Sequence, residues 1–237
     1  IIVRDESLDL ELYLKLKSKF FLMSQNAIGS KRALTSRLHA KKSTILEGTS
    51  LHIIVVTIQC MHSCSYCQVS RQQAGDEFTI SRKDLLLACD TIFESTSDTL
   101  TVEFQGGDPL IKYDLVKLAI EYITEKNKEH NRSIRFVVTT TLHQLTSEMC
   151  LFFKEHQVVL STSIDGLADL HNKNRPIANR DAYERTIEGL ELARQELGQD
   201  SVSALMTTTR KSLNYPSEIV DAYVQLGFKD IFIRGLS

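Results

Sequence analysis

Six short runs of β-branched and aromatic residues alternate with five amphipathic stretches, and this alternation limits the fold of the chain more than any other feature. The apolar runs have the length of buried strands, and the stretches between them have the period of helices with one apolar face. We expect strands at 51–58, 99–104, 133–139, 157–164, 201–206 and 230–234, and helices at 81–94, 112–129, 144–155, 180–197 and 216–226. Strands and helices in alternation form right-handed βαβ units, so the sequence predicts an α/β protein with a parallel sheet that is buried on both faces.

Residues 1–47 differ in character from the remainder of the chain. They contain nine Lys and Arg against five Asp and Glu, whereas the whole chain has a formal charge of −2. Leu8, Leu12, Leu16 and Phe20 recur at helical spacing, residues 24–30 resemble a loop, and 31–39 suit a second helix. We therefore expect a short, mainly helical N-terminal segment with a boundary near residue 48.

Composition excludes several classes of protein. Of the 237 residues 42% are hydrophobic, which is enough for one large core. A net charge of −2 predicts no strong attraction to nucleic acid or to anionic membranes, and no apolar run approaches the roughly 20 residues of a membrane helix. The chain begins at Ile1 without an initiator Met and shows no export signal, so we expect a cytoplasmic protein represented by a fragment.

Three of the five cysteines lie within eight residues, directly after the first predicted strand. Cys60, Cys64 and Cys67 form a C-x3-C-x2-C motif on what must be a short loop. Three such thiolates can ligate three irons of one cubane cluster and leave the fourth iron open. A zinc ion with His62 or His171 as a further ligand, or a redox-active pair of Cys64 and Cys67, are the alternatives.

The other two cysteines, Cys89 and Cys150, fall singly in predicted helices. A free cysteine in the apolar face of a helix behaves as a small hydrophobic residue. We expect both thiols to be buried and structural.

Polar and glycine-rich segments follow the other predicted strands. Gly106 and Gly107 end the second strand, where they permit close approach of the backbone, and Asp108 comes next, where it can face a ligand ammonium. Hydroxyl-rich segments end the third, fourth and fifth strands, at 139–141, 161–163 and 207–209. In parallel α/β folds the carboxyl ends of the strands carry the chemistry, so these segments are expected to surround one site.

The cysteine motif, with an aromatic residue before its last cysteine, resembles the signature of the radical S-adenosylmethionine (SAM) superfamily. The resemblance implies a partial (β/α)6 TIM-like barrel over residues 48–237 and a [4Fe-4S] cluster held by Cys60, Cys64 and Cys67 as metal-binding and catalytic residues. It also implies that the open iron binds the amino and carboxylate groups of SAM. One electron then cleaves SAM to methionine and a 5′-deoxyadenosyl radical, which takes a hydrogen atom from the substrate.

Two further segments resemble motifs of this superfamily. Residues 106–109 are similar to its Gly-Gly-Glu-Pro segment, with Asp108 in place of Glu, and residues 163–166 with 171–175 are similar to a segment of its peptide-modifying members, such as the anaerobic sulfatase maturases. The resemblance implies that Ser163 contacts the ribose of SAM and that Arg175 contacts its carboxylate. The SAM-binding residues that it implies are Tyr66, Gly106, Gly107, Asp108, Thr140, Ser163, Asp165 and Arg175.

Within the superfamily, residues 50–53, 67–72 and 233–237 look like the His-Xaa-Ser system radical SAM maturase. This likeness implies a ribosomally made peptide or protein as substrate, with His-Xaa-Ser repeats as one form of it, and a one-electron donor such as flavodoxin or ferredoxin. It also implies an auxiliary-cluster domain after residue 237. From the positive charge and the position of residues 1–47 we expect this segment to help hold a leader peptide. A radical SAM enzyme acting on a small molecule, or a non-catalytic iron–sulfur or zinc binding module, are the other possibilities.

Overall fold

A computed structural model of the chain describes residues 9–22, 27–46, 48–73 and 75–235. The chain divides into two compact units, Ile1–Gly48 and Thr49–Ser237. None of the helices in the described part of the chain is long and apolar enough to cross a membrane.

The first unit contains two helices, α1 (Leu10–Ser18) and α2 (Ile28–Leu46). Helix α1 buries none of its residues. Helix α2 begins inside the segment 24–30 that was expected to be a loop. It continues past 39 because Ala40, Lys41 and Lys42 are good helix formers and no glycine or proline occurs before its end. Leu8 and residues 24–26 lie outside the described residues.

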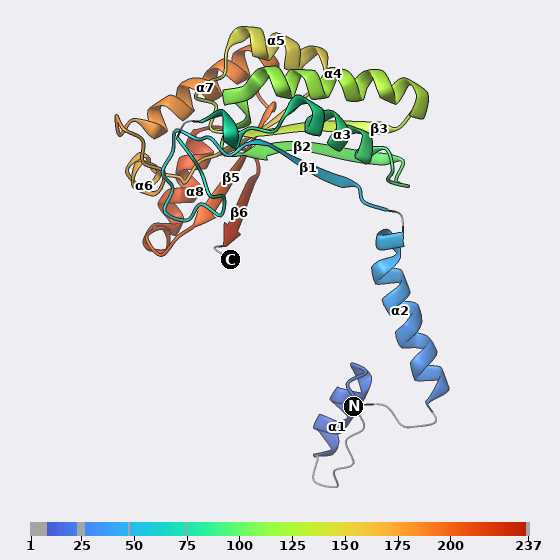
Figure 1. Ribbon diagram of the computed structural model, residues 1–237. Coiled ribbons are helices and arrows are strands. Elements are labelled where there is room, and N and C mark those ends of the chain that lie inside the picture. The colour runs from blue at the N-terminus through green and yellow to red at the C-terminus, as the bar shows by residue number, and fades with distance from the viewer. Residues whose placement is uncertain (1–8, 23–26, 47, 74, 236–237) are drawn as a thin grey trace. The chain divides into compact units, whose positions relative to one another are not determined.

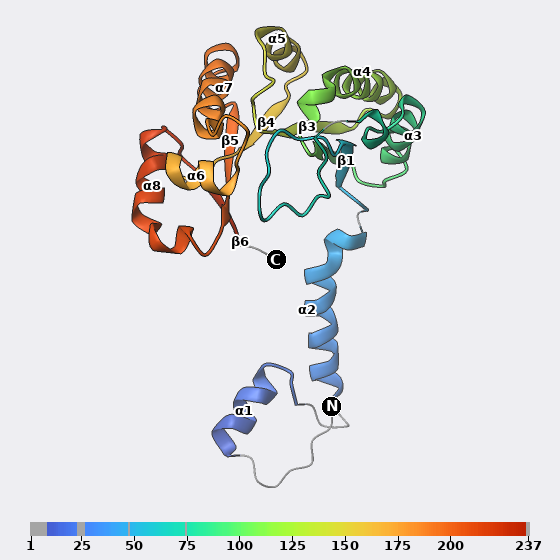
Figure 2. The ribbon, with the colours of Figure 1, turned by 60° about the vertical axis from the view of Figure 1, so that its left-hand side comes forward.

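The second unit is built on one parallel six-stranded sheet with the strand order β1-β2-β3-β4-β5-β6. The strands are β1 (Leu51–Thr57), β2 (Thr99–Gly106), β3 (Ser133–Thr140), β4 (Val159–Ser163), β5 (Val202–Thr208) and β6 (Ile231–Gly235). The sheet curves, and β1 and β6 are its two edges, so it forms an open, partial barrel (Figures 1 and 2). All six predicted strands and the predicted parallel α/β fold are confirmed.

Helices cover the outer face of the curved sheet, as Figure 2 shows. They are α3 (Arg82–Ile92), α4 (Tyr113–His130), α5 (Ser147–Glu155), α7 (Ala182–Leu197) and α8 (Pro216–Gln225), which confirms the five predicted helices. The sequence did not predict α6 (Ala168–Asn174) or the three 3-10 turns at Asp76–Phe78, Pro109–Lys112 and Ser212–Asn214. Helix α6 has only seven residues and lacks the apolar period from which a helix can be recognised.

Alternate residues along each strand divide the sheet into two faces. One set, which includes Val56, Phe104 and Leu160, packs fully buried against the helices. Cys89 and Cys150 are completely buried in the same core, as predicted. The other set points to the concave face and is largely polar, so the interior of the partial barrel has the chemistry of a binding site.

Candidate active site

A cavity of about 250 Å³ lies at the carboxyl edge of the sheet; we call it the central cavity. It is bordered by nine of the residues proposed above from the sequence: Cys60, Cys64, Cys67, Tyr66, Gly106, Gly107, Thr140, Ser163 and Arg175. These residues come from the loop after β1, from the ends of β2, β3 and β4, and from the residue after α6. The fold thus brings together side chains that lie more than 100 positions apart in the sequence.

The loop after β1 carries the three cysteines and is held in place by its own backbone. Cys60 N–H donates to Gln72 O at 3.0 Å, which closes the loop on itself. Ser63 N–H donates to Pro176 O at 2.8 Å, which ties the loop to the segment after α6. Cys60 is buried, Cys64 is half-buried and Cys67 is exposed, so the loop places its thiols at different depths along one wall of the cavity.

The thiols of the loop influence one another's pKa. The pKa of Cys60 is raised to about 12, mainly by burial and in smaller part by the charges of Asp108, Cys64 and Cys67, against a backbone hydrogen bond from His62 that lowers it. Burial also raises the pKa of Cys64, whereas the Arg175 guanidinium opposes this. A bound metal deprotonates thiols that would otherwise stay neutral, so positive irons at this site would supply the missing countercharge.

The donor set of the loop consists of three thiols that border one cavity. Across the described ranges, no three His, Cys, Asp or Glu side chains converge closely enough to hold one ion. A zinc ion requires its ligands around a single point. A cubane instead takes one thiolate at each of three irons, and three thiols are the donors that such a cluster would use here.

The two histidines considered as further zinc ligands, His62 and His171, each have one ring nitrogen in contact with another group and one without a hydrogen-bond partner among the described residues. The ring of His62 packs on that of His143 with centroids 4.6 Å apart, and the two Nε2 atoms are 3.4 Å apart. His171 Nδ1 accepts a hydrogen bond from the Asp165 backbone at 3.3 Å. Burial, together with the charges of neighbouring His and Arg side chains, lowers the pKa of His62 to about 2, and burial lowers the pKa of His171 well below its usual value.

Glycine is required at 106 and 107 because the backbone at the end of β2 lies against the backbone of residues 57–59. Gly106 has a φ of +140°, and a Cβ there would lie 2.0 Å from Thr57 O; a Cβ on Gly107 would lie 2.0 Å from Gln59 O. Gly107 N–H donates to Thr57 O at 2.8 Å. Both glycines therefore fasten the end of β2 to the start of the cysteine loop, and they border the central cavity as well.

Asp108 points into the protein rather than toward the central cavity. Its side chain is 1% exposed. It accepts hydrogen bonds from Thr140 Oγ1 at 2.7 Å, from Thr141 N at 3.2 Å and from the hydroxyl of Thr141. The sequence predicted a side chain facing a ligand; the threonines at the end of β3 occupy its oxygens instead, so Asp108 joins the ends of β2 and β3.

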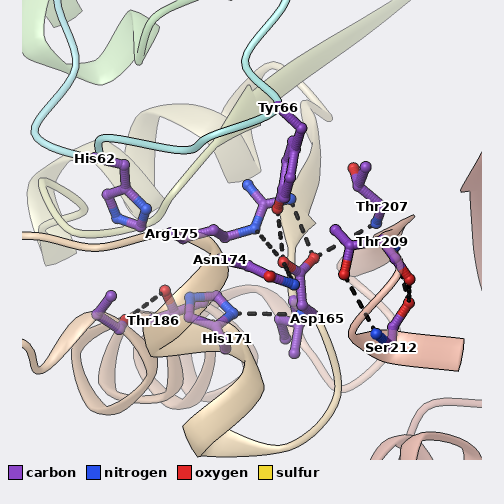
Figure 3. Close-up of polar contacts among 12 residues, drawn as sticks. His62, Tyr66, Asp165, His171, Asn174, Arg175, Thr186, Thr207, Thr209 and Ser212 are labelled. Carbon is purple, nitrogen blue, oxygen red and sulfur yellow. Dashed lines mark hydrogen bonds and ion pairs between the residues drawn. The ribbon is translucent and has the colours of Figure 1, made fainter. Parts of the chain in front are cut away.

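Asp165 is the centre of a buried polar cluster (Figure 3). Its carboxylate accepts from Tyr66 Oη at 2.6 Å, from Asn174 Nδ2 at 3.2 Å and from Thr207 N at 3.4 Å. Arg175 Nε lies 3.2 Å and Arg175 Nη2 3.3 Å from its two oxygens. The Asp165 side chain is completely buried and does not border the central cavity. It connects the cysteine loop, the end of α6 and β5 behind the cavity wall.

Arg175 is a buried cation whose charge is balanced by this cluster. Burial alone would lower the pKa of Arg175, but the charges of Asp165, Tyr66 and Cys64 outweigh burial and raise the pKa above its ordinary value. The guanidinium also lies over the Tyr66 ring at 5.3 Å from the centroid. No described residue accepts a hydrogen bond from its Nη1, so a fixed cationic donor remains available at the cavity wall.

Several residues of the cavity wall were not singled out from the sequence. Glu103, Gln105, Leu205 and Arg234 all border the central cavity. The alternation of residues along each strand could have indicated them. Residues that pack on the helices alternate with residues on the concave face, and these residues belong to the second set. Thr139 and Thr207, whose hydroxyls were expected at the mouth of the barrel, border the same cavity.

Comparison with known proteins gives matches of sequence and of fold. A family model described as "Radical SAM superfamily" matches residues 54–222. A protein of Methanothermobacter thermautotrophicus is 25% identical over 188 residues, which cover 75% of this chain and 65% of that protein. The cysteine-type anaerobic sulfatase-maturating enzyme of Clostridium novyi is 25% identical over 143 residues, which cover 57% of this chain and 37% of the enzyme.

Solved structures share the fold. The structure of anSMEcpe with bound AdoMet matches with a TM-score of 0.70 at 17% identity, covering 79% of this chain and 51% of that one. Streptococcus suis SuiB bound to precursor peptide SuiA matches with a TM-score of 0.61 at 16% identity, covering 96% of this chain and 51% of that one. The chain therefore spans about half the length of these solved proteins, and less than two thirds of the length of the curated relatives above.

Proposed function

The chain belongs to the radical SAM superfamily, and from this premise we propose that it cleaves SAM reductively at a [4Fe-4S] cluster and modifies a ribosomally made peptide or protein. The observation that carries the proposal is that the three thiols of the C-x3-C-x2-C loop border the same cavity as Gly106, Gly107, Ser163 and Arg175. An electron carrier or a zinc module has no use for SAM-binding groups at the neighbouring strand ends.

Each part of the cavity has a role in this proposal. Cys60, Cys64 and Cys67 hold the cluster. When bound, such a cluster supplies the electron that divides SAM into methionine and a 5′-deoxyadenosyl radical. Arg175 binds the SAM carboxylate through its free donor, because a guanidinium suits a carboxylate and Asp165 has already fixed its position.

The polar groups at the strand ends complete the SAM site. Ser163 binds the ribose, the backbone at Gly106 and Gly107 receives the amino group, and Tyr66 lines the adenine side, with Thr140 as a further hydrogen-bonding group. Asp108 and Asp165 act through other residues, since both carboxylates are buried behind the cavity wall. Asp108 fixes Thr140, and Asp165 fixes Tyr66 and Arg175.

A peptide or protein substrate is supported by what the similar proteins act on. The Clostridium novyi relative is a sulfatase-maturating enzyme, SuiB was solved with a precursor peptide, and anSMEcpe was solved with the Cp18Cys peptide. The resemblance to the His-Xaa-Ser system maturases narrows the substrate to a peptide with such repeats. We include in the proposal a flavodoxin or ferredoxin as electron donor and an auxiliary-cluster domain following residue 237.

Residues 1–47 are proposed to hold the leader part of the peptide. Their charge is positive, and helix α1 exposes the apolar side chains of Leu10, Leu12 and Leu14, so both charge and apolar surface are available. Reversing the charges of Lys15 and Lys17 to Glu should weaken binding of an acidic leader. Unchanged affinity for such a leader would contradict this assignment.

The activity is tested by 5′-deoxyadenosine formation. The protein is reconstituted anaerobically with iron and sulfide, reduced, and given SAM, and the nucleoside is quantified by mass spectrometry. We expect turnover by the wild type and by Cys150→Ala, which removes a thiol that does not border the cavity, and none by the variant with Cys60, Cys64 and Cys67 all changed to Ala. A wild type that binds iron and sulfide but forms no deoxyadenosine would contradict the proposal.

A further inference from the structure

Glu103 is a carboxylate on the concave face of the sheet, inside the partial barrel. It lies on β2 next to Ile53 of β1 and Val137 of β3, its register partners in the parallel sheet. Side chains at register partners share one face of a sheet, so Glu103 stands between two apolar neighbours. Among the described residues that border the central cavity, it is the one with a carboxylate.

Neutral donors fix the Glu103 carboxylate from one side. Gln105 Nε2 and Thr139 Oγ1 both donate to its Oε1, each at 2.6 Å. No described donor bonds to Oε2, and no described Lys, Arg or His lies within ion-pair distance. The side chain is therefore held in one orientation with half of its hydrogen-bonding capacity unused.

In the described part of the chain, the arginines that border the same cavity contact residues other than Glu103. Arg175 is paired with Asp165, Arg234 Nη2 donates to Gln68 Oε1 at 2.6 Å, and Arg71 Nη2 donates to Ser63 Oγ at 2.6 Å. A half-buried carboxylate with one oxygen that accepts no hydrogen bond costs free energy unless a partner is supplied. The Glu103 carboxylate has no cationic partner in the described fold. A ligand with a positive group would supply that partner.

We propose that Glu103 is a specificity-determining residue that binds a cationic group of the peptide substrate inside the barrel. The cation is an ammonium, guanidinium or imidazolium of the segment that undergoes modification. This inference rests on the proposed function, because it takes the occupant of the barrel to be a peptide. The inference adds that the part of the peptide that enters the barrel carries a positive charge. No motif in the sequence specifies this charge.

SAM is the competing ligand, since it carries an ammonium and a sulfonium of its own. The two possibilities differ in what the neutral variant Glu103→Gln loses. If Glu103 binds SAM, the variant loses affinity for SAM; if it binds the peptide, the variant keeps its affinity for SAM and loses the preference for a cationic peptide. The Gln side chain keeps the shape and the acceptor oxygen, so the fold is preserved.

The experiment selects peptides from a displayed library of random heptapeptides, on reconstituted protein with SAM bound. Four forms are compared: wild type, Glu103→Gln, Glu103→Lys, and the control Glu121→Gln, which removes one exposed carboxylate on α4. We expect wild type and control to enrich Lys, Arg or His about ten-fold over Glu103→Gln, as the loss of a charged hydrogen bond implies. Glu103→Lys should favour Asp and Glu.

Three results would overturn the proposal. One is the same charge preference, or none, in wild type and Glu103→Gln. Another is an SAM affinity that falls about ten-fold or more in Glu103→Gln, which would assign the carboxylate to SAM. The third is a preference in Glu103→Lys that still favours cations. Deoxyadenosine formation is measured in parallel on all four forms, so failure of the proposed activity itself would show as absence of turnover in the wild type.

Discussion

Replacing Asp165 by Asn should destabilise the second unit severely, although the two side chains have the same shape. The Asp165 side chain is completely buried, and the Arg175 side chain is 9% exposed, so the substitution leaves a buried guanidinium without its anion. Removing one partner of a buried ion pair costs about 3–5 kcal/mol. The Asn amide also presents donors to Arg175 and Asn174, which are donors themselves, so the cost should lie within this range rather than below it.

The assay is urea unfolding of the reduced, metal-free protein, followed by circular dichroism and extrapolated linearly to water. Tyr66→Phe removes one hydrogen bond to the same carboxylate and should cost about 1.5–3 kcal/mol. Asp200→Asn, which breaks the exposed pair with Lys229, serves as a matched control and should leave the midpoint unchanged. A loss of less than about 1 kcal/mol in Asp165→Asn would refute the argument that the ion pair and its donors are a buried network.

Further predictions concern the backbone and the second buried carboxylate. Gly107→Ala should prevent the end of β2 from closing on the cysteine loop, because its Cβ would meet Gln59 O at 2.0 Å, and a fall in the melting temperature by more than about 5 °C should accompany it. Gly29→Ala meets no atom within 4 Å in helix α2 and should instead raise helix content slightly, as circular dichroism would show; a fall would contradict this. Asp108→Ala should leave the Thr140 hydroxyl free to move and weaken SAM binding without abolishing it, which equilibrium dialysis measures; unchanged affinity and unchanged stability would contradict the role assigned to Asp108.

The periodicity of the sequence was sufficient to predict the sheet and its outer helices, because burial on one face imposes a repeat of 2 on strands and 3.6 on helices. Helix α6 escaped notice since its seven residues include only one apolar residue that is buried, Leu170. Its position is set by tertiary contacts, with Asn174 and Arg175 at its end bonded to Asp165.

The sequence was sufficient to predict which residues lie near the site, but not the direction in which their side chains point. The cysteines, the glycine pair and Arg175 follow strand ends and were predicted to share one site, and the fold places them around one cavity. Whether a carboxylate faces a ligand depends on which donors surround it, and Asp108 and Asp165 lie next to donors far away in sequence. Glu103 escaped notice for the opposite reason, since a single acidic residue in a strand carries no signal until the fold shows which face it occupies.

The most direct test of the account is the electron paramagnetic resonance spectrum of the reduced, reconstituted protein before and after addition of SAM. The account predicts a [4Fe-4S] signal that changes on addition of SAM, since an iron left open by three cysteine ligands takes SAM as its next ligand. It also predicts no such signal in the variant that lacks Cys60, Cys64 and Cys67. A cluster signal that stays the same at saturating SAM would contradict the account.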